Sequence, residues 1–261
     1  MTALRAILQL TRLDSSLLGF FVIFIPVWHR THDLGVSFGK AIPLLFICMC
    51  TFIANSLDDI ERDQVNHPSR PLPSRQLTPT FAALLYFVCL GGALFSTRNY
   101  IAPDIAFWYY GLIILAISYN YIVEYFPAIK APYVAAIISA TILTVAASYP
   151  KEKRLYILAV AVFLIACGRE ICMDIPDRAG DTKSVMHSFN PLSLAMVGFS
   201  LQASALLLLA SQVRRPRDIA DIAVMALFLL LAAVYWFKMA RYRYAIYLMK
   251  GQFMVGLYFL W

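Results

Sequence analysis

The chain has 261 residues, of which 61% are hydrophobic and 14% charged, and its mean hydropathy is +0.70. Ordinary soluble domains are only about 45–50% apolar, so this composition excludes a soluble fold. The net charge of +7 comes from Lys and Arg residues in loops and at the ends of apolar segments, where basic residues anchor membrane proteins. It therefore does not indicate nucleic-acid binding.

Apolar runs long enough to cross about 30 Å of hydrocarbon recur along the whole chain. Only helices or closed barrels satisfy the backbone inside lipid, and runs of this length are helical. We therefore predict an all-α, multi-pass integral membrane protein with about nine transmembrane helices in one domain, residues 1–261. Residues 1–16 are interpreted as a retained interfacial segment that leads into the first helix. The predicted helices cover residues 15–31, 39–57, 80–97, 103–123, 132–149, 154–172, 190–212, 218–238 and 243–260.

Two connecting segments differ from the others, because residues 55–78 and 169–190 are long, charged and rich in proline. They follow the second and the sixth predicted helix. An even number of crossings separates them, so they are expected on the same face of the membrane. Lys and Arg number 12 on that face and 10 on the other, which favours a cytoplasmic location for both segments.

The first of these segments carries Asn55, Asp59 and Asp63 at intervals of four residues. On a continuing helix this spacing places all three side chains on one face. We call them the first acidic row. Arg62 and Arg70 lie beside it in the sequence.

The second segment repeats the pattern with a second acidic row, and Arg169 and Lys183 lie beside it. Carboxylates near a hydrocarbon boundary are costly unless they are paired or coordinated, so both rows are functional candidates. The second acidic row consists of Glu170, Asp174, Asp177 and Asp181.

Two acidic rows that face one another repel and need cations between them. Hard oxygen ligands without nearby His or Cys suit Mg²⁺, which binds a few carboxylates together with phosphate oxygens of a substrate. Arginine contributes strong hydrogen bonds to phosphate, and metal ions neutralise the charge on a departing diphosphate. The sequence thus predicts a diphosphate site at a membrane face, beside an apolar pocket for a lipid tail.

These segments resemble the two aspartate-rich motifs of the UbiA superfamily of intramembrane prenyltransferases. Residues 55–63 are similar to the motif N-D-x-x-D-x-x-x-D, and residues 66–75 to the segment N-x-x-x-R-P-L-P-S-G that follows it. Residues 168–181 resemble the second motif, K-D-x-x-D-x-x-G-D. The resemblance covers the whole chain. Ser56, Met173 and Arg75 depart from the pattern, which usually has Asp, Lys and Gly at these positions.

The resemblance implies a helical bundle around a central cavity and a reaction with an isoprenoid diphosphate donor, Mg²⁺ and a small acceptor. An aromatic acid or phenol is the acceptor we expect first, although quinone, chlorin, haem and glycerophosphate branches of the superfamily share the same motifs. Ionisation of the donor would give a carbocation-like intermediate that the acceptor captures. The resemblance assigns Mg²⁺ binding to Asn55, Asp59, Asp63, Asp174, Asp177 and Asp181, and catalysis to Asp59, Asp63, Asp174 and Asp181. It assigns substrate binding to Asn55, Arg62, Arg70, Arg169 and Lys183.

Two alternatives remain open from the sequence. A terpene cyclase of the same superfamily would ionise the same diphosphate without an acceptor. A transporter would use the acids to bind a translocated cation, although transport sites lie near the midplane of the membrane and these acids cluster at one face.

Overall fold

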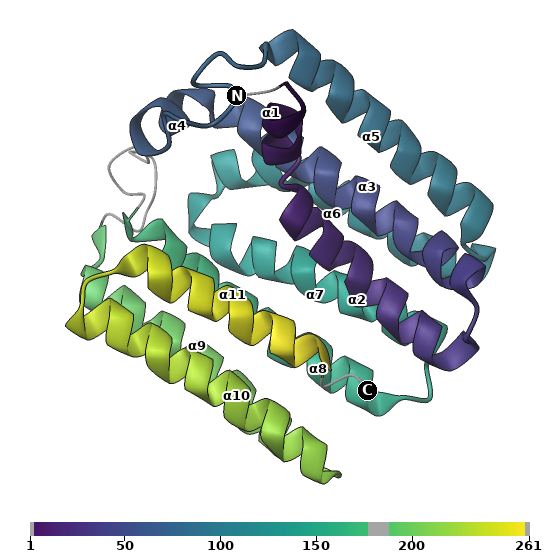
Figure 1. The fold of residues 1–261 in the computed structure, drawn as a ribbon, viewed down its shortest axis with the longest axis vertical. Coiled ribbons are helices and arrows are strands. Elements are labelled where there is room, and N and C mark those ends of the chain that lie inside the picture. The colour runs from purple at the N-terminus through teal and green to yellow at the C-terminus, as the bar shows by residue number, and fades with distance from the viewer. Residues whose placement is uncertain (1–2, 177–187, 259–261) are drawn as a thin grey trace. The chain divides into compact units, whose positions relative to one another are not determined.

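The computed structural model describes residues 3–176 and 188–258, and all secondary structure in these ranges is helical (Figure 1). Each of the nine predicted segments contains a helix, so the all-α prediction is confirmed. Seven of the described helices are long and apolar enough to cross a membrane, and an eighth span results if the bent pair at the N-terminus counts as one. The described part of the last helix is 17 residues long.

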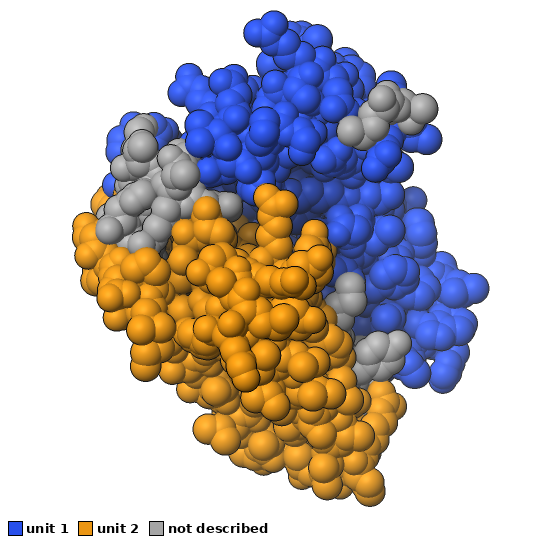
Figure 2. Space-filling model, turned by 60° about the vertical axis from the view of Figure 1, so that its left-hand side comes forward, with its two compact units in different colours: residues 1–125, 179–181 blue, residues 126–178, 182–261 orange. Residues whose placement is uncertain are grey.

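The chain divides into two compact units, which Figure 2 shows in blue and orange. The first acidic row belongs to unit 1, and the described part of the second row belongs to unit 2. That the two units form the single domain predicted from the sequence stays a prediction.

Unit 1 is organised around its third helix, which packs mainly against three others and ends in the first acidic row. Its core includes Leu44, Ile47 and Ile53, which are at most 2% exposed. The helix begins five residues before the predicted start because the side chain of Asp33 accepts a hydrogen bond from the Val36 amide and caps it. The helices of unit 1 are α1 (Ala3–Leu10), α2 (Leu13–Thr31), α3 (Leu34–Asp58), α4 (Ile60–Asn66), α5 (Pro79–Tyr100) and α6 (Pro103–Tyr125).

The N-terminal segment is helical and bends by 51° where α1 meets α2. The bend falls at Arg12, whose φ of 42° lies in the left-handed region and stops the first helix. α1 and α2 both contact α3. The segment before the first predicted span therefore packs on the helix that carries the first acidic row.

Unit 2 has the same plan, with its central helix packed against three neighbours and ending in the second acidic row. Prolines occupy the first turn of two of its helices, where the missing N–H costs nothing. Its helices are α7 (Lys130–Ser148), preceded by the short η1 (Pro127–Ile129), α8 (Lys153–Asp174), α9 (Pro191–Ala210), α10 (Pro216–Ala233), continued by the π-helical turn η4 (Val234–Lys238), and α11 (Tyr242–Tyr258).

α8 and α9 approach closely where two glycines meet. A Cβ atom added to Gly168 would lie 2.3 Å from the carbonyl oxygen of Gly198, and one added to Gly198 would lie 2.6 Å from Cys172 Sγ. Small residues allow such contact between membrane helices. Gly168 lies two residues before Glu170 and six before Asp174, so the crossing holds this end of α8 against its neighbour.

Candidate functional site

The first acidic row lies where α3 passes into α4. The backbone turns slightly at Asp59, but the helical hydrogen bonds continue, from Asp59 N–H to Asn55 O (3.0 Å) and from Asp63 N–H to Asp59 O (2.8 Å). The three side chains, spaced four residues apart, therefore lie on one face of the continuous helix, as predicted from the sequence.

Neighbouring side chains of this row contact one another directly. Asn55 Nδ2 donates a hydrogen bond to Asp59 Oδ2 at 2.8 Å, and Arg62 Nη2 lies 2.7 Å from Asp59 Oδ1. The amide nitrogen of Asn55 is thus directed at Asp59. Its carbonyl oxygen is the atom that Asn55 can offer to a cation.

The third member of the row, Asp63, is only 4% exposed and forms an ion pair with Arg70. A single nitrogen, Arg70 Nη1, contacts Asp63 Oδ1 at 2.6 Å and Oδ2 at 2.7 Å. Arg70 Nε and Nη2 make no hydrogen bond within the part of the chain that the structure describes. Asp63 therefore positions Arg70, whose other N–H groups have the chemistry to donate to an anion.

The segment after Arg70 folds as a series of tight turns. Ser74 N–H donates to Arg70 O (3.0 Å), and Gln76 N–H donates to Pro71 O (2.9 Å). Arg75, between them, has a φ of 57°. This left-handed conformation strains residues that have a Cβ atom, so the structure explains why the family pattern has Gly at this position.

An Arg75→Gly variant is therefore expected to be more stable by about 0.5–1 kcal/mol, because relief of the left-handed strain exceeds the entropic cost of glycine. The thermal unfolding midpoint in detergent would measure the gain. Ser69→Gly, in the same segment but without a positive φ, serves as the control and should lose stability. Equal losses in both variants would contradict the argument.

A cavity of about 190 Å³ in unit 1 is bounded by Asp63 and Arg70. Whole ligands of drug size need pockets of about 300–1,000 Å³, so this cavity suits a polar head group. Arg12 also lines it and stacks over the ring of Phe52, with its guanidinium carbon 5.0 Å from the ring centre. The remaining lining residues are Gln9, Leu10, Asp14, Ser56, Pro71, Leu72 and Pro73.

In unit 2 the second row ends α8, and its described acids are each contacted by a basic residue. Asp174 Oδ1 lies 2.5 Å from Lys130 Nζ, and Glu170 Oε1 lies 2.5 Å from Arg169 Nη2. Both residues are 7% exposed. Arg169 Nε is also buried and has no hydrogen-bond partner among the described residues.

Three residues predicted for the site, Asp177, Asp181 and Lys183, lie outside the described residues. Their roles stay predictions, as do the catalytic, metal-binding and substrate-binding roles of Asn55, Asp59, Asp63, Asp174, Arg62, Arg70 and Arg169.

The residues of the first row have the donor chemistry that Mg²⁺ requires. Asn55 Oδ1 and the carboxylates of Asp59 and Asp63 are hard oxygen ligands on one helical face. Within residues 3–176 and 188–258, no three His, Cys, Asp or Glu side chains are close enough to form a metal site alone. The first row thus fits a cation that shares its ligands with a phosphate substrate, which is how Mg²⁺ is usually held.

Three polar residues at these sites were not assigned a role from the sequence. Lys130 lies 44 residues before its partner Asp174, and Arg12 and Ser56 line the unit 1 cavity. One signal for Lys130 existed, because it is the only charged residue between Glu124 and Lys151. Its partner could not be read from periodicity.

Comparisons with known proteins identify related sequences. Residues 16–261 match the family model of the UbiA prenyltransferase family. A digeranylgeranylglyceryl phosphate synthase of Thermococcus kodakarensis is 31% identical over 176 residues, which cover 66% of this chain and 54% of the relative. The digeranylgeranylglyceryl phosphate synthase of Pyrococcus furiosus is 31% identical over 141 residues, which cover 52% of this chain and 49% of the relative. The chain spans about half the length of the curated relatives it matches.

Solved structures share the fold over nearly the entire chain. One solved structure aligns with a TM-score of 0.68 at 20% identity, covering 100% of this chain and 98% of the other. Its description concerns the biosynthesis of digeranylgeranylglyceryl phosphate synthase in membranes. A UbiA homolog from Archaeoglobus fulgidus, bound to GPP and Mg²⁺, aligns with a TM-score of 0.66 at 16% identity, covering 98% and 99%. At these identities the likeness establishes the fold.

Proposed function

The chain belongs to the UbiA prenyltransferase family, and from this premise we propose that it transfers a prenyl group from an allylic isoprenoid diphosphate to an acceptor in the membrane. The observation that carries the proposal is the Asp63–Arg70 pair, which borders a cavity of head-group size and continues the helical row of Asn55 and Asp59. The site is built for an anion at a membrane boundary. A prenyl diphosphate combines such an anion with an apolar tail.

Arg70 would bind the donor diphosphate through the N–H groups that it does not use for Asp63. Arg62 would add positive charge beside Asp59. During transfer the C–O bond between the allylic carbon and the diphosphate breaks, and the electron pair leaves on the diphosphate. The acceptor oxygen bonds to the same carbon, and its proton passes to the released diphosphate or to water. Fixed donors stabilise the leaving charge without reorganisation.

Mg²⁺ dependence is part of the proposal. In unit 1, Asn55, Asp59 and Asp63 would hold an ion. In unit 2, Asp174 would do so with Asp177 and Asp181. When bound, Mg²⁺ neutralises charge on the departing diphosphate. UbiA homologs with this fold have been solved with GPP and Mg²⁺ and with DMAPP and Mg²⁺, which supports the choice of Mg²⁺ as the ion.

For the acceptor we propose a glyceryl phosphate with a free hydroxyl group, with or without an ether-linked prenyl chain on another oxygen. The names of the related synthases favour this class over the aromatic acceptor expected from the sequence. Arg12, at the cavity beside Arg70, supplies a second guanidinium that suits an acceptor with its own phosphate.

The test is an assay of the purified full chain in detergent with C10 and C20 allylic diphosphates, with and without geranylgeranylglyceryl phosphate. Diphosphate release and organic products would be followed together, the latter by mass spectrometry. We expect an ether product only when donor, acceptor and Mg²⁺ are all present, and none with EDTA.

Other outcomes of this assay are equally informative. Release with a hydrocarbon or terpene alcohol product in the absence of acceptor would contradict transfer and indicate a cyclase. A product only with 4-hydroxybenzoate would overturn the glyceryl phosphate acceptor and leave prenyl transfer intact.

A further inference from the structure

Unit 2 contains a second charged cluster, at the opposite end of α8 from the second acidic row. α8 runs from Lys153 to Asp174, and its 22 residues span about 33 Å at 1.5 Å per residue. This is the thickness of the hydrocarbon core of a membrane. The cluster and the second acidic row therefore lie at opposite membrane faces, and the proposed reaction does not use the cluster.

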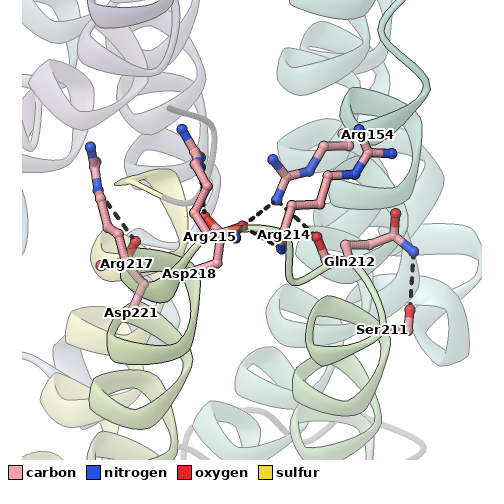
Figure 3. A network of polar contacts seen from close by, with 8 residues as sticks. All are labelled: Arg154, Ser211, Gln212, Arg214, Arg215, Arg217, Asp218 and Asp221. Atoms are coloured by element: carbon pink, nitrogen blue, oxygen red, sulfur yellow. Dashed lines mark hydrogen bonds and ion pairs between the residues drawn. The ribbon is translucent and has the colours of Figure 1, made fainter.

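The centre of the cluster is Asp218, which is fully buried. Its carboxylate accepts hydrogen bonds from the backbone N–H of Arg214 (3.0 Å) and of Arg215 (3.2 Å). Arg154 Nη2, from the start of α8, lies 3.0 Å from Asp218 Oδ2 and 3.0 Å from the carbonyl oxygen of Gln212 (Figure 3). Asp218 thus fixes the turn between α9 and α10 against the start of α8.

The cluster has six basic side chains against three acidic ones. Asp218 is already matched by Arg154 and Arg215, and Arg217 lies 3.8 Å from Asp221. Within the part of the chain that the structure describes, the side chains of Lys151, Lys153 and Arg214 form no ion pair, and both lysines are exposed. The cluster consists of Lys151, Glu152, Lys153, Arg154, Arg214, Arg215, Arg217, Asp218 and Asp221.

Apolar surface begins directly next to these charges. Both α8 and the α10–η4 helix are apolar enough to cross a membrane, and each begins within the cluster. Tyr156 on α8, Leu207 on α9 and Ile219 on α10 are 43%, 74% and 60% exposed. An excess of positive charge thus borders exposed apolar side chains. This surface is complementary to a molecule that has an anionic head group and acyl chains.

We propose that this cluster is a binding site for the phosphate head group of an anionic phospholipid, in the leaflet opposite the second acidic row. Arg214, Lys151 and Lys153 bind the phosphate, and Asp218 keeps the turn that carries Arg214 in place. Basic clusters between membrane helices bind such head groups, and each Lys or Arg near an anionic surface adds attraction. The acyl chains lie along the exposed apolar side chains of α8, α9 and α10.

The test compares lipid binding by the delipidated full chain and by a Lys151→Gln/Lys153→Gln/Arg214→Gln variant. Dioleoyl phosphatidylglycerol or phosphatidylcholine is titrated into neutral detergent at low salt, and bound lipid is counted by native mass spectrometry. We expect the chain to retain phosphatidylglycerol selectively, and the triple variant to bind it roughly 100-fold more weakly, at about fivefold for each charge removed.

A matched control removes the same charge from unit 1 through Arg5→Gln/Lys40→Gln/Arg98→Gln and should bind phosphatidylglycerol as the unmodified chain does. If the control variant bound phosphatidylglycerol as weakly as the cluster variant, the assignment to this cluster would be overturned. Unchanged binding by the cluster variant would overturn it as well. Inorganic phosphate at the concentration of the lipid should not displace it. Displacement by phosphate would overturn the lipid in favour of a free anion.

Discussion

An Asp59→Asn variant is expected to lose at least about 100-fold of its Mg²⁺-dependent prenyl transfer while it keeps its fold. The carbonyl oxygen of the substituted amide can still accept the hydrogen bond from Asn55, so the local geometry persists. The negative charge that a cation needs is gone, and Arg62 loses its counter-ion. Turnover with donor, acceptor and Mg²⁺, together with the thermal unfolding midpoint in detergent, measures both parts of this expectation.

Glu61→Gln is the matched control for this variant. Glu61 carries the same charge two residues further along α4, but it is exposed and lies off the face of the first acidic row. Glu61→Gln should retain wild-type turnover.

Asp174→Asn tests unit 2 in the same way and should also lose turnover, since it removes the anion beside Lys130. Wild-type activity in both Asp59→Asn and Asp174→Asn would overturn the site.

Arg70→Ala is expected to lower the free energy of unfolding by about 3 kcal/mol, because it leaves the buried carboxylate of Asp63 without its cation. This loss is at the low end of the range for removing one partner of a buried ion pair, because the Arg70 side chain is 29% exposed. Chemical unfolding in detergent, followed by circular dichroism, measures the loss.

Arg70→Lys separates the structural role of Arg70 from its substrate role. Only one nitrogen of Arg70 contacts Asp63, so the ammonium of Lys can replace that contact and should retain most of the stability. Lys lacks the other donors that we assign to the diphosphate, so the KM for the donor should rise about tenfold or more. A Lys variant with unchanged donor KM would show that Arg70 serves only to neutralise Asp63.

Helical periodicity accounts for what could be predicted locally. The contact between Asn55 and Asp59 follows from their spacing, because residues four apart meet on any helix. The same reasoning located the nine helical segments. It missed the early start of α3, because the cap formed by Asp33 lies in a polar segment that hydrophobicity alone does not assign to a helix.

The contacts between helices could not be predicted in this way. Arg154 and Asp218 are 64 residues apart, and their pairing depends on how α8, α9 and α10 pack. The same is true of Lys130 and Asp174. Sequence spacing carries no information on which faces of separate helices meet, because every apolar face can pack against another.

The sequence by itself thus determined a helical membrane protein with acidic rows at the ends of two of its helices, since length, hydropathy and spacing are properties of local chain geometry. Only the tertiary structure decided which cation each acid holds. It gave Arg70 to Asp63, Lys130 to Asp174, and Arg154 to Asp218. A buried carboxylate needs a partner, but the identity of that partner depends on which helix or turn the fold brings beside it.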